Sequence, residues 1–143
     1  NVFATKEGLI DQKYDYLFYE AKLFKVELPE SGWIIKYEDL NQWFDMNLTK
    51  LGLNEKEKSQ FMEYWMNRLP KSNYYEIKLF SNEFLNENMH LDIYPKPDTI
   101  IRLIFNFRPL DERINILEPN IITPERKGFT VVEWGGILDN FNF

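Results

Sequence analysis

The strongest structural signal in this chain lies in residues 40–70, which read LNQWFDMNLTKLGLNEKEKSQFMEYWMNRLP. Its apolar side chains recur every three to four residues, the period of a helix with one buried face. The first stripe is Leu40, Phe44, Leu48 and Leu51, and the second is Phe61, Trp65 and Leu69. The spacing therefore predicts two consecutive amphipathic helices.

The ends of both helices are also marked in the sequence. Gly52 can adopt the left-handed conformation that ends a helix. Asn54, followed three residues later by Glu57, matches the capping box that begins one. Pro70 ends the second helix because it has no amide hydrogen to donate. The short connection between the two helices predicts an αα-hairpin.

Extended segments are expected on either side of this hairpin. They are residues 14–20, 22–28, 33–35, 74–80, 90–94, 99–107, 114–117 and 129–134. Thr99–Phe107 is apolar on both faces, which predicts a central strand with helices packed on one side. Ser81 is placed to cap a short helical turn, and Gly135 with Gly136 should end the last strand. The expected fold class is α+β, a mainly antiparallel sheet with the αα-hairpin packed on one face.

Composition limits the class of protein. A chain of 143 residues with 44% hydrophobic and 17% aromatic residues is expected to form a single globular domain, 1–143. No stretch approaches the roughly 20 apolar residues of a membrane-spanning helix. The absence of cysteine excludes disulfides and thiolate chemistry. A net charge of −6 argues against nucleic acid as a partner.

Four of the five arginines lie between residues 94 and 128. They are Arg102, Arg108, Arg113 and Arg126. One interpretation is ion pairing with nearby acids, namely Asp111, Glu112, Glu118 and Glu125. The alternative is a face that binds anions or carboxylates, for which the guanidinium fork is suited. Arg102 and Arg126 are therefore candidate binding residues.

Catalytic candidates are few. His90 is the only histidine, and no serine lies in the Gly-x-Ser-x-Gly motif of a catalytic nucleophile. Glu133 lies in an apolar strand, where burial would raise its pKa as a general acid requires, and Asp98 follows the turn at 95–97. Two such carboxylates would suit a glycosidase-like hydrolase. The alternative is a buried Glu133 paired with an arginine. No metal site and no cofactor are expected.

Aromatic residues suggest a binding surface. Trp33 and Trp134 are the leading candidates among tryptophans and tyrosines that exceed the needs of one small core. Flat rings exposed on a sheet would suit sugar rings or peptide partners. The alternative is an aromatic-rich core.

Several motifs in a fixed order resemble a known family. They are residues 16–20, Gly32-Trp33, residues 52–57, Phe61, Tyr64-Trp65, residues 95–99, Ile101-Arg102 and residues 126–136. The set is similar to a bacterial and archaeal family of extracytoplasmic proteins that has no assigned function. Its members often begin with a secretory or lipoprotein-like segment and a small β-rich region, which this chain lacks. The resemblance implies a secreted or cell-surface domain, and it implies no catalytic residue, cofactor or substrate.

Because residue 1 is Asn, the chain is expected to be processed or excised from a longer exported protein, with a lipid anchor as one upstream element. The expected function is a non-catalytic binding or interaction module with a protein or glycan partner. The alternatives are the carboxylate-dependent hydrolase and a structural spacer.

Overall fold

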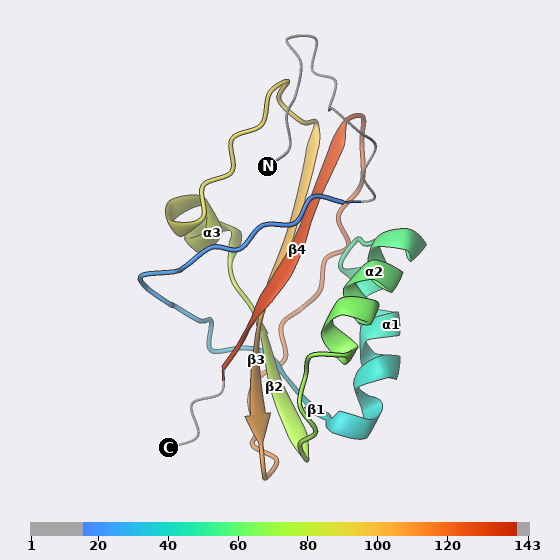
Figure 1. Ribbon diagram of the computed structural model, residues 1–143, viewed down its shortest axis with the longest axis vertical. Helices are drawn as coiled ribbons and strands as arrows, with labels where there is room; N and C mark the ends of the chain where they lie inside the picture. The colour runs from blue at the N-terminus through green and yellow to red at the C-terminus, as the bar shows by residue number, and fades with distance from the viewer. Residues whose placement is uncertain (1–15, 140–143) are drawn as a thin grey trace.

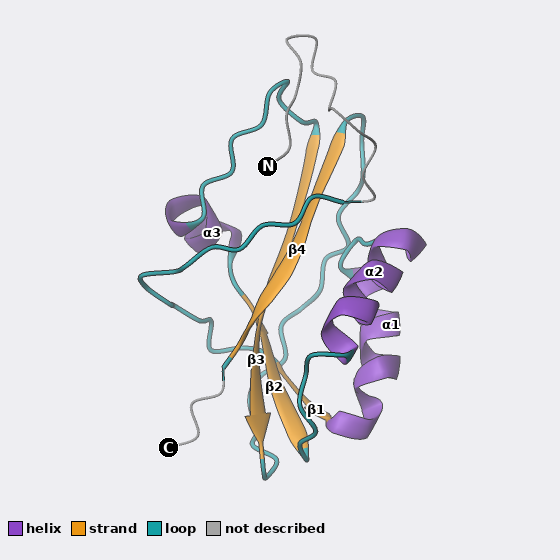
Figure 2. Cartoon of the chain, viewed as in Figure 1, coloured by secondary structure: helices purple, strands orange, loops and turns teal. Residues whose placement is uncertain are grey.

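The chain forms a four-stranded sheet with three α-helices in a computed structural model, which describes residues 16–139 (Figures 1 and 2). The elements are β1 (Trp33–Lys36), the 3-10 helix η1 (Tyr37–Asp39), α1 (Leu40–Lys50), α2 (Glu55–Met66), β2 (Tyr74–Leu79), α3 (Asn82–Asn88), β3 (Thr99–Leu110) and β4 (Thr130–Leu138). The α+β class is confirmed. Helices α1 and α2 lie together on one side of the sheet and α3 lies on the other (Figure 1).

The strands are ordered β1-β2-β3-β4 across the sheet. The first two pairings are antiparallel, and β3 pairs with β4 in parallel, with Leu103 beside Trp134. A parallel pair needs a long crossover, which residues 111–129 supply. This crossover reaches the helices, where Arg126 donates to the carbonyl oxygen of Gly52 at 2.7 Å. Because β4 is the last strand in this order, it forms one edge of the sheet.

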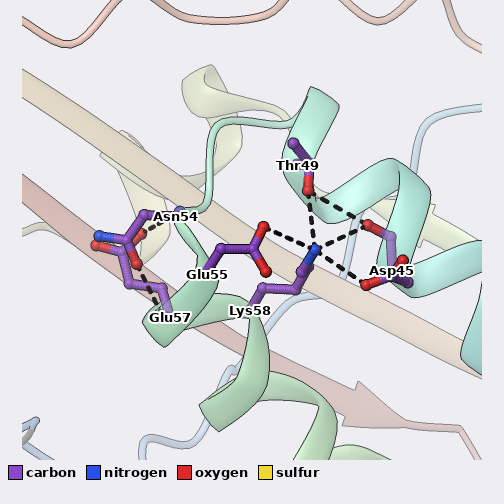
Figure 3. Close-up of polar contacts among 6 residues, drawn as sticks. All are labelled: Asp45, Thr49, Asn54, Glu55, Glu57 and Lys58. Atoms are coloured by element: carbon purple, nitrogen blue, oxygen red, sulfur yellow. Dashed lines mark hydrogen bonds and ion pairs between the residues drawn. The ribbon is translucent and has the colours of Figure 1, made fainter.

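The αα-hairpin is confirmed together with the signals that predicted its ends. Gly52 has φ of +107°, which an L side chain rarely adopts. The Asn54 side chain accepts from the amide of Glu57, and the Glu57 carboxylate accepts from the amide of Asn54, both at 2.9 Å. Lys58 of α2 reaches back to Asp45 of α1 at 2.9 Å, which joins the helices (Figure 3).

Two clusters of buried side chains lie on opposite faces of the sheet. The larger cluster packs α1 and α2 against the sheet, and its rings include Phe44, Phe61, Trp65, Phe105 and Phe107. The smaller one lies at α3 and consists of Phe80, Phe84, Leu85 and Ile104. Alternation along β3 sends Phe105 to the first and Ile104 to the second. The prediction of a central strand that is apolar on both faces is confirmed.

Several extended segments were predicted as strands and are not. Residues 16–20, 22–28, 90–94 and 114–117 join no strand, because their backbones have no ladder partner in the described part of the chain. Residues 14 and 15 of the first segment lie outside that part. Aromatic and β-branched side chains also suit an irregular segment that packs against the protein, so composition alone does not make a strand.

The prediction that Gly135 and Gly136 end the last strand is wrong. β4 continues through both to Leu138, with Gly136 paired to Phe105. A Cβ at position 136 would lie 2.7 Å from the Phe107 ring and 2.9 Å from the Trp65 ring. Glycine is therefore required here by close packing against two aromatic rings and not by a turn.

Candidate functional site

The segment of residues 16–28 wraps around the free edge of β4. On one face of the sheet, the Tyr16 ring lies 5.7 Å from that of Trp134. On the opposite face, the Tyr19 hydroxyl donates to Glu133, the neighbour of Trp134 in β4. Because successive side chains of a strand point to opposite faces, the segment must cross the edge of β4 between these contacts. Figure 1 shows it passing over β4 from the side of α2 to the side of α3.

A surface pocket of about 280 Å³ lies where this segment meets α2. Its lining residues are Tyr16, Gln60, Glu63, Tyr64, Asn67 and Arg68. Four of them lie three, four, seven and eight positions after Gln60 in the sequence. Together with Gln60 they form one stripe along α2 and its C-terminal end. Tyr16 supplies the remaining lining side chain. The pocket therefore joins a helix surface to the wrapping segment.

Two of the lining side chains are already engaged. The Asn67 amide donates to the carbonyl oxygen of Glu63 at 2.6 Å. The Arg68 guanidinium lies 3.6 Å from the centre of the Tyr64 ring, a cation–π contact. Within residues 16–139, no hydrogen bond or ion pair engages the side chain of Gln60 or Glu63. An amide and a carboxylate are therefore free to bind a ligand in this pocket.

A second polar cluster is buried on the face of the sheet opposite α2. Arg102 of β3 donates from Nε to Glu133 of β4 at 2.5 Å, and from Nη2 to the carbonyl oxygen of Met89 at 2.6 Å. Glu133 is only 8% exposed and also accepts from the Tyr19 hydroxyl. Burial, then the hydrogen bond to Glu133, raises the pKa of Tyr19 well above its usual range. Tyr19 therefore stays protonated as a donor.

This geometry matches the pairing alternative for Glu133. A general acid needs a carboxyl group that holds a proton near neutral pH. Glu133 instead accepts hydrogen bonds from the guanidinium of Arg102 and the hydroxyl of Tyr19, so both partners use its carboxyl group as an acceptor. The cluster is suited to fixing structure, and a proton-donating role for Glu133 has no support from its contacts.

A third cluster surrounds Lys58, whose side chain is 9% exposed (Figure 3). Its ammonium lies 2.9 Å from Asp45, 3.1 Å from Glu55 and 3.2 Å from the hydroxyl of Thr49. Hydrogen bonds to Asp45 and then Glu55 raise the pKa of Lys58. A lysine nucleophile needs a lowered pKa, so this lysine is suited to joining α1 and α2 rather than to chemistry.

The remaining predicted site residues lie apart from one another. Trp33 is 3% exposed and packs on Trp43, so its ring is closed to an external ligand. Trp134 is half-buried beneath Tyr16. His90 is exposed between α3 and β3, outside any strand. Asp98 accepts from the amide of Phe129 at 2.7 Å. None of these residues lines the pocket on α2.

The four arginines do have partners, but these are not Asp111, Glu112, Glu118 or Glu125. Arg102 pairs with Glu133, and Arg108 makes a two-pronged contact with Glu76 at 3.1 and 2.7 Å. Arg126 pairs with Glu57, and Arg113 donates to the side chain of Asn115 at 2.6 Å. Three of these partners lie on other strands or on α2. The arginines are thus engaged, and they form no open anion-binding face.

Sequence reasoning missed the lining residues Gln60, Glu63, Asn67 and Arg68. Their only signal is that they share the face of α2 opposite its buried stripe, which is also how an ordinary solvated helix face appears. Tyr16 and Tyr19 belong both to a predicted strand and to the aromatic residues that suggested a binding surface, and neither was a leading candidate. Their role follows from the path of the segment around β4, which no local pattern encodes.

Among residues 16–139, no group of three or more histidine, aspartate or glutamate side chains is placed to hold a metal ion. In the same range, no helix has the length and apolar character needed to cross a bilayer. No protein-family model, curated protein or solved structure matches the chain. The family resemblance seen in the sequence therefore stays a prediction.

Proposed function

We propose that this protein is a non-catalytic binding module and that its ligand is a glycan held in the pocket on α2. The observation that supports the proposal is the meeting of Tyr16 with the outer stripe of α2. There an aromatic ring lies in the same pocket as the free side chains of Gln60 and Glu63. An aromatic body with a few directed polar groups is the common composition of small-molecule sites.

The chemistry of the lining favours a polyhydroxylated ligand. An amide both donates and accepts hydrogen bonds, and a carboxylate accepts them, which matches sugar hydroxyls. The ring of Tyr16 offers an apolar surface for the C–H face of a sugar. The charges of Glu63 and Arg68 balance, so the pocket has no bias toward an ionic ligand.

The size of the pocket sets the scale of the ligand. About 280 Å³ lies near the lower limit of the roughly 300–1,000 Å³ typical of small-molecule sites. One sugar ring of a longer chain would fill it, and flanking rings would lie on the surface. Such a site gives modest affinity, because one small pocket has few atoms with which to offset the entropy lost on binding.

Binding of hexasaccharides tests the proposal by isothermal titration calorimetry. The panel is chitohexaose, cellohexaose and xylohexaose, each titrated into the 143-residue protein at neutral pH. Saturable binding of at least one glycan is expected. Each of Gln60→Ala and Glu63→Ala should weaken it about three- to tenfold, the value of one or two hydrogen bonds.

The matched control is Ser59→Ala, which changes an exposed residue of α2 that does not line the pocket. It should bind as the unaltered protein does. The glycan proposal fails if the panel shows no saturable binding at millimolar concentrations. It also fails if Ser59→Ala weakens binding as much as Glu63→Ala.

We also infer, from the family resemblance of the sequence, that the module lies outside the cytoplasm, as part of a secreted or cell-surface protein. Fractionation of the source cells checks this. Recovery with the secreted or surface material is the expected result, and recovery only from the cytoplasm would contradict it.

A further inference from the structure

Tyr16 can line the pocket only if the segment of residues 16–28 is held in place. This segment contains no helix or strand, so no backbone ladder fixes it. Two ring contacts hold its first part, Tyr16 on Trp134 and Phe18 on Tyr64, with ring centres 5.7 and 6.0 Å apart. The Tyr16 and Phe18 side chains are half exposed. Apolar contacts of this kind define position loosely because they have little directionality.

The Tyr19 hydroxyl supplies the directional contact. Within the described residues, its hydrogen bond to Glu133 is the polar contact that joins residues 16–28 to the sheet. The ion pair between Lys25 and Glu27 lies within the segment itself. Leu23 and Leu28 then pack on the cluster at α3. Tyr19 thus marks the point where the segment changes from one face of the sheet to the other.

The acceptor for this hydroxyl is rigidly placed. Glu133 lies in β4 directly beside Arg102 of β3, and the pair is buried, with side chains 8% and 5% exposed. Arg102 is also bonded to the carbonyl oxygen of Met89. A hydrogen bond to a charged group in a buried setting is stronger than one between neutral groups in water.

We propose that the contact of Tyr19 with the Arg102–Glu133 pair is a latch that positions Tyr16 against α2 and so completes the pocket. Tyr19 is a positioning residue, since it lies outside the pocket lining and acts through Tyr16, three residues away. The buried ion pair then has a role beyond joining β3 to β4. The part of this inference that concerns affinity rests on the proposed glycan-binding function.

Tyr19→Phe tests the latch, because it removes only the hydroxyl and leaves Glu133 paired with Arg102. The matched control is Tyr94→Phe, whose ring is 98% exposed. Since the chain has no cysteine, Glu20→Cys and Ser59→Cys can attach two spin labels, one on the segment and one on α2. Pulsed electron paramagnetic resonance then reports the distribution of distances between them without any ligand.

We expect a narrow distribution of label-to-label distances in the doubly labelled protein and in the same protein with Tyr94→Phe. With Tyr19→Phe we expect a clearly broader distribution. An unchanged distribution with Tyr19→Phe overturns the latch. This result is independent of glycan binding, so it decides the latch even if the glycan panel gives no binding and the proposed function fails.

Titration with the glycan that binds most tightly among chitohexaose, cellohexaose and xylohexaose tests the link to affinity. Tyr19→Phe should weaken binding about fivefold to tenfold, the effect of losing one hydrogen bond from a partly exposed hydroxyl to a buried charged group. Tyr94→Phe should have no effect. A broader distance distribution with unchanged affinity would show that the segment moves without serving the pocket, and would overturn the inference.

Discussion

Beneath α1 and α2, the side chains that the sheet itself buries are aromatic or aliphatic, whereas on its opposite face the sheet also buries Glu76, Arg102, Asn106 and Glu133. On the first face, Phe44, Phe61 and Phe105 pack edge to face with ring centres 5.3 to 6.4 Å apart. On the second, a short helix and an irregular segment cover charged groups. The packing of the first face depends only on the shape and burial of its side chains. The charged groups of the second face depend on hydrogen-bond or ion-pair partners at fixed positions.

The difference suggests a division of roles. Burial and dispersion provide most of the stability of a domain, and the hydrophobic effect has no preferred direction. Buried ion pairs add little net stability, since desolvation offsets their attraction. They do fix position, because each charge must keep its partner. We therefore expect the helix-covered face to dominate folding and the opposite face to hold the segment that forms the pocket.

Phe61→Ala should have the largest effect on stability. Phe61 is fully buried and contacts Phe44, Phe105 and Trp134. Its truncation should lower the free energy of unfolding by about 4 kcal/mol, through lost burial and the cavity left behind. Urea unfolding followed by circular dichroism measures this change. Phe24→Ala, at a ring that is 98% exposed, should change stability by less than about 0.5 kcal/mol. Equal losses for both would remove the distinction between packed and exposed rings.

Arg102→Met should have the next largest effect, on the opposite face. It leaves the buried Glu133 without its cation, which should lower the free energy of unfolding by about 3 kcal/mol. We place the loss at the low end of the expected range because Nη1 of Arg102 has no hydrogen-bond partner among the described residues. The double variant Arg102→Met/Glu133→Leu should regain most of this loss. Urea unfolding of all three proteins checks it, and a double variant less stable than Arg102→Met would contradict the account.

Alkaline pH should have the smallest effect of the three. Burial, and then the nearby Tyr37 charge, raises the pKa of Tyr75 from 10.0 to about 12. The unfolded chain therefore releases this proton at lower pH than the folded protein does. Stability from this group is complete below pH 10 and is lost as pH rises to about 12, by roughly 2 kcal/mol in total.

Tyr75→Phe isolates this contribution from that of the other tyrosines and lysines. At neutral pH the variant should be about 1 kcal/mol less stable, since the Tyr75 hydroxyl donates to the carbonyl oxygen of Pro70 at 2.6 Å. Between pH 10 and 12 its stability should fall less steeply than that of the unaltered protein. Parallel slopes in urea unfolding across this range would contradict the assignment.

Sequence patterns predicted the helix-covered face well. The stripes on α1 and α2, the glycine at 52 and the pairing of Asn54 with Glu57 are local signals, because helix geometry couples residues three or four apart. The fully apolar run at β3 was equally informative. These features are determined by short-range periodicity, and the structure confirms each of them.

The opposite face was harder to predict because its contacts join distant parts of the chain. Arg102 and Glu133 are 31 residues apart, and Arg108 and Glu76 are 32 apart. An arginine has no local signal for its partner, so the acids near the arginines in sequence were chosen, and that choice was wrong. The pairing of Glu133 with an arginine was anticipated as an alternative, but which arginine it would be was not. The role of Gly136 likewise depends on the rings of Trp65 and Phe107, which only the folded chain brings together.

The candidate pocket could not be predicted for a related reason. Its polar residues lie on the solvent side of α2, where nearly any hydrophilic sequence is compatible with a helix. The position of Tyr16 depends on how the segment of residues 16–28 crosses β4, and the aromatic-rich composition at the start of that segment indicated a strand instead.

The central claim is that the pocket between α2 and Tyr16 binds a glycan, and amide chemical-shift mapping tests it most directly. The ¹⁵N-labelled protein is titrated with whichever of chitohexaose, cellohexaose and xylohexaose binds. The account predicts that the largest shift changes occur at Tyr16, Gln60, Glu63, Tyr64 and Arg68, with little change near Asp98 or His90. Changes centred on Asp98 or His90, or no changes with any of the three glycans, would contradict it.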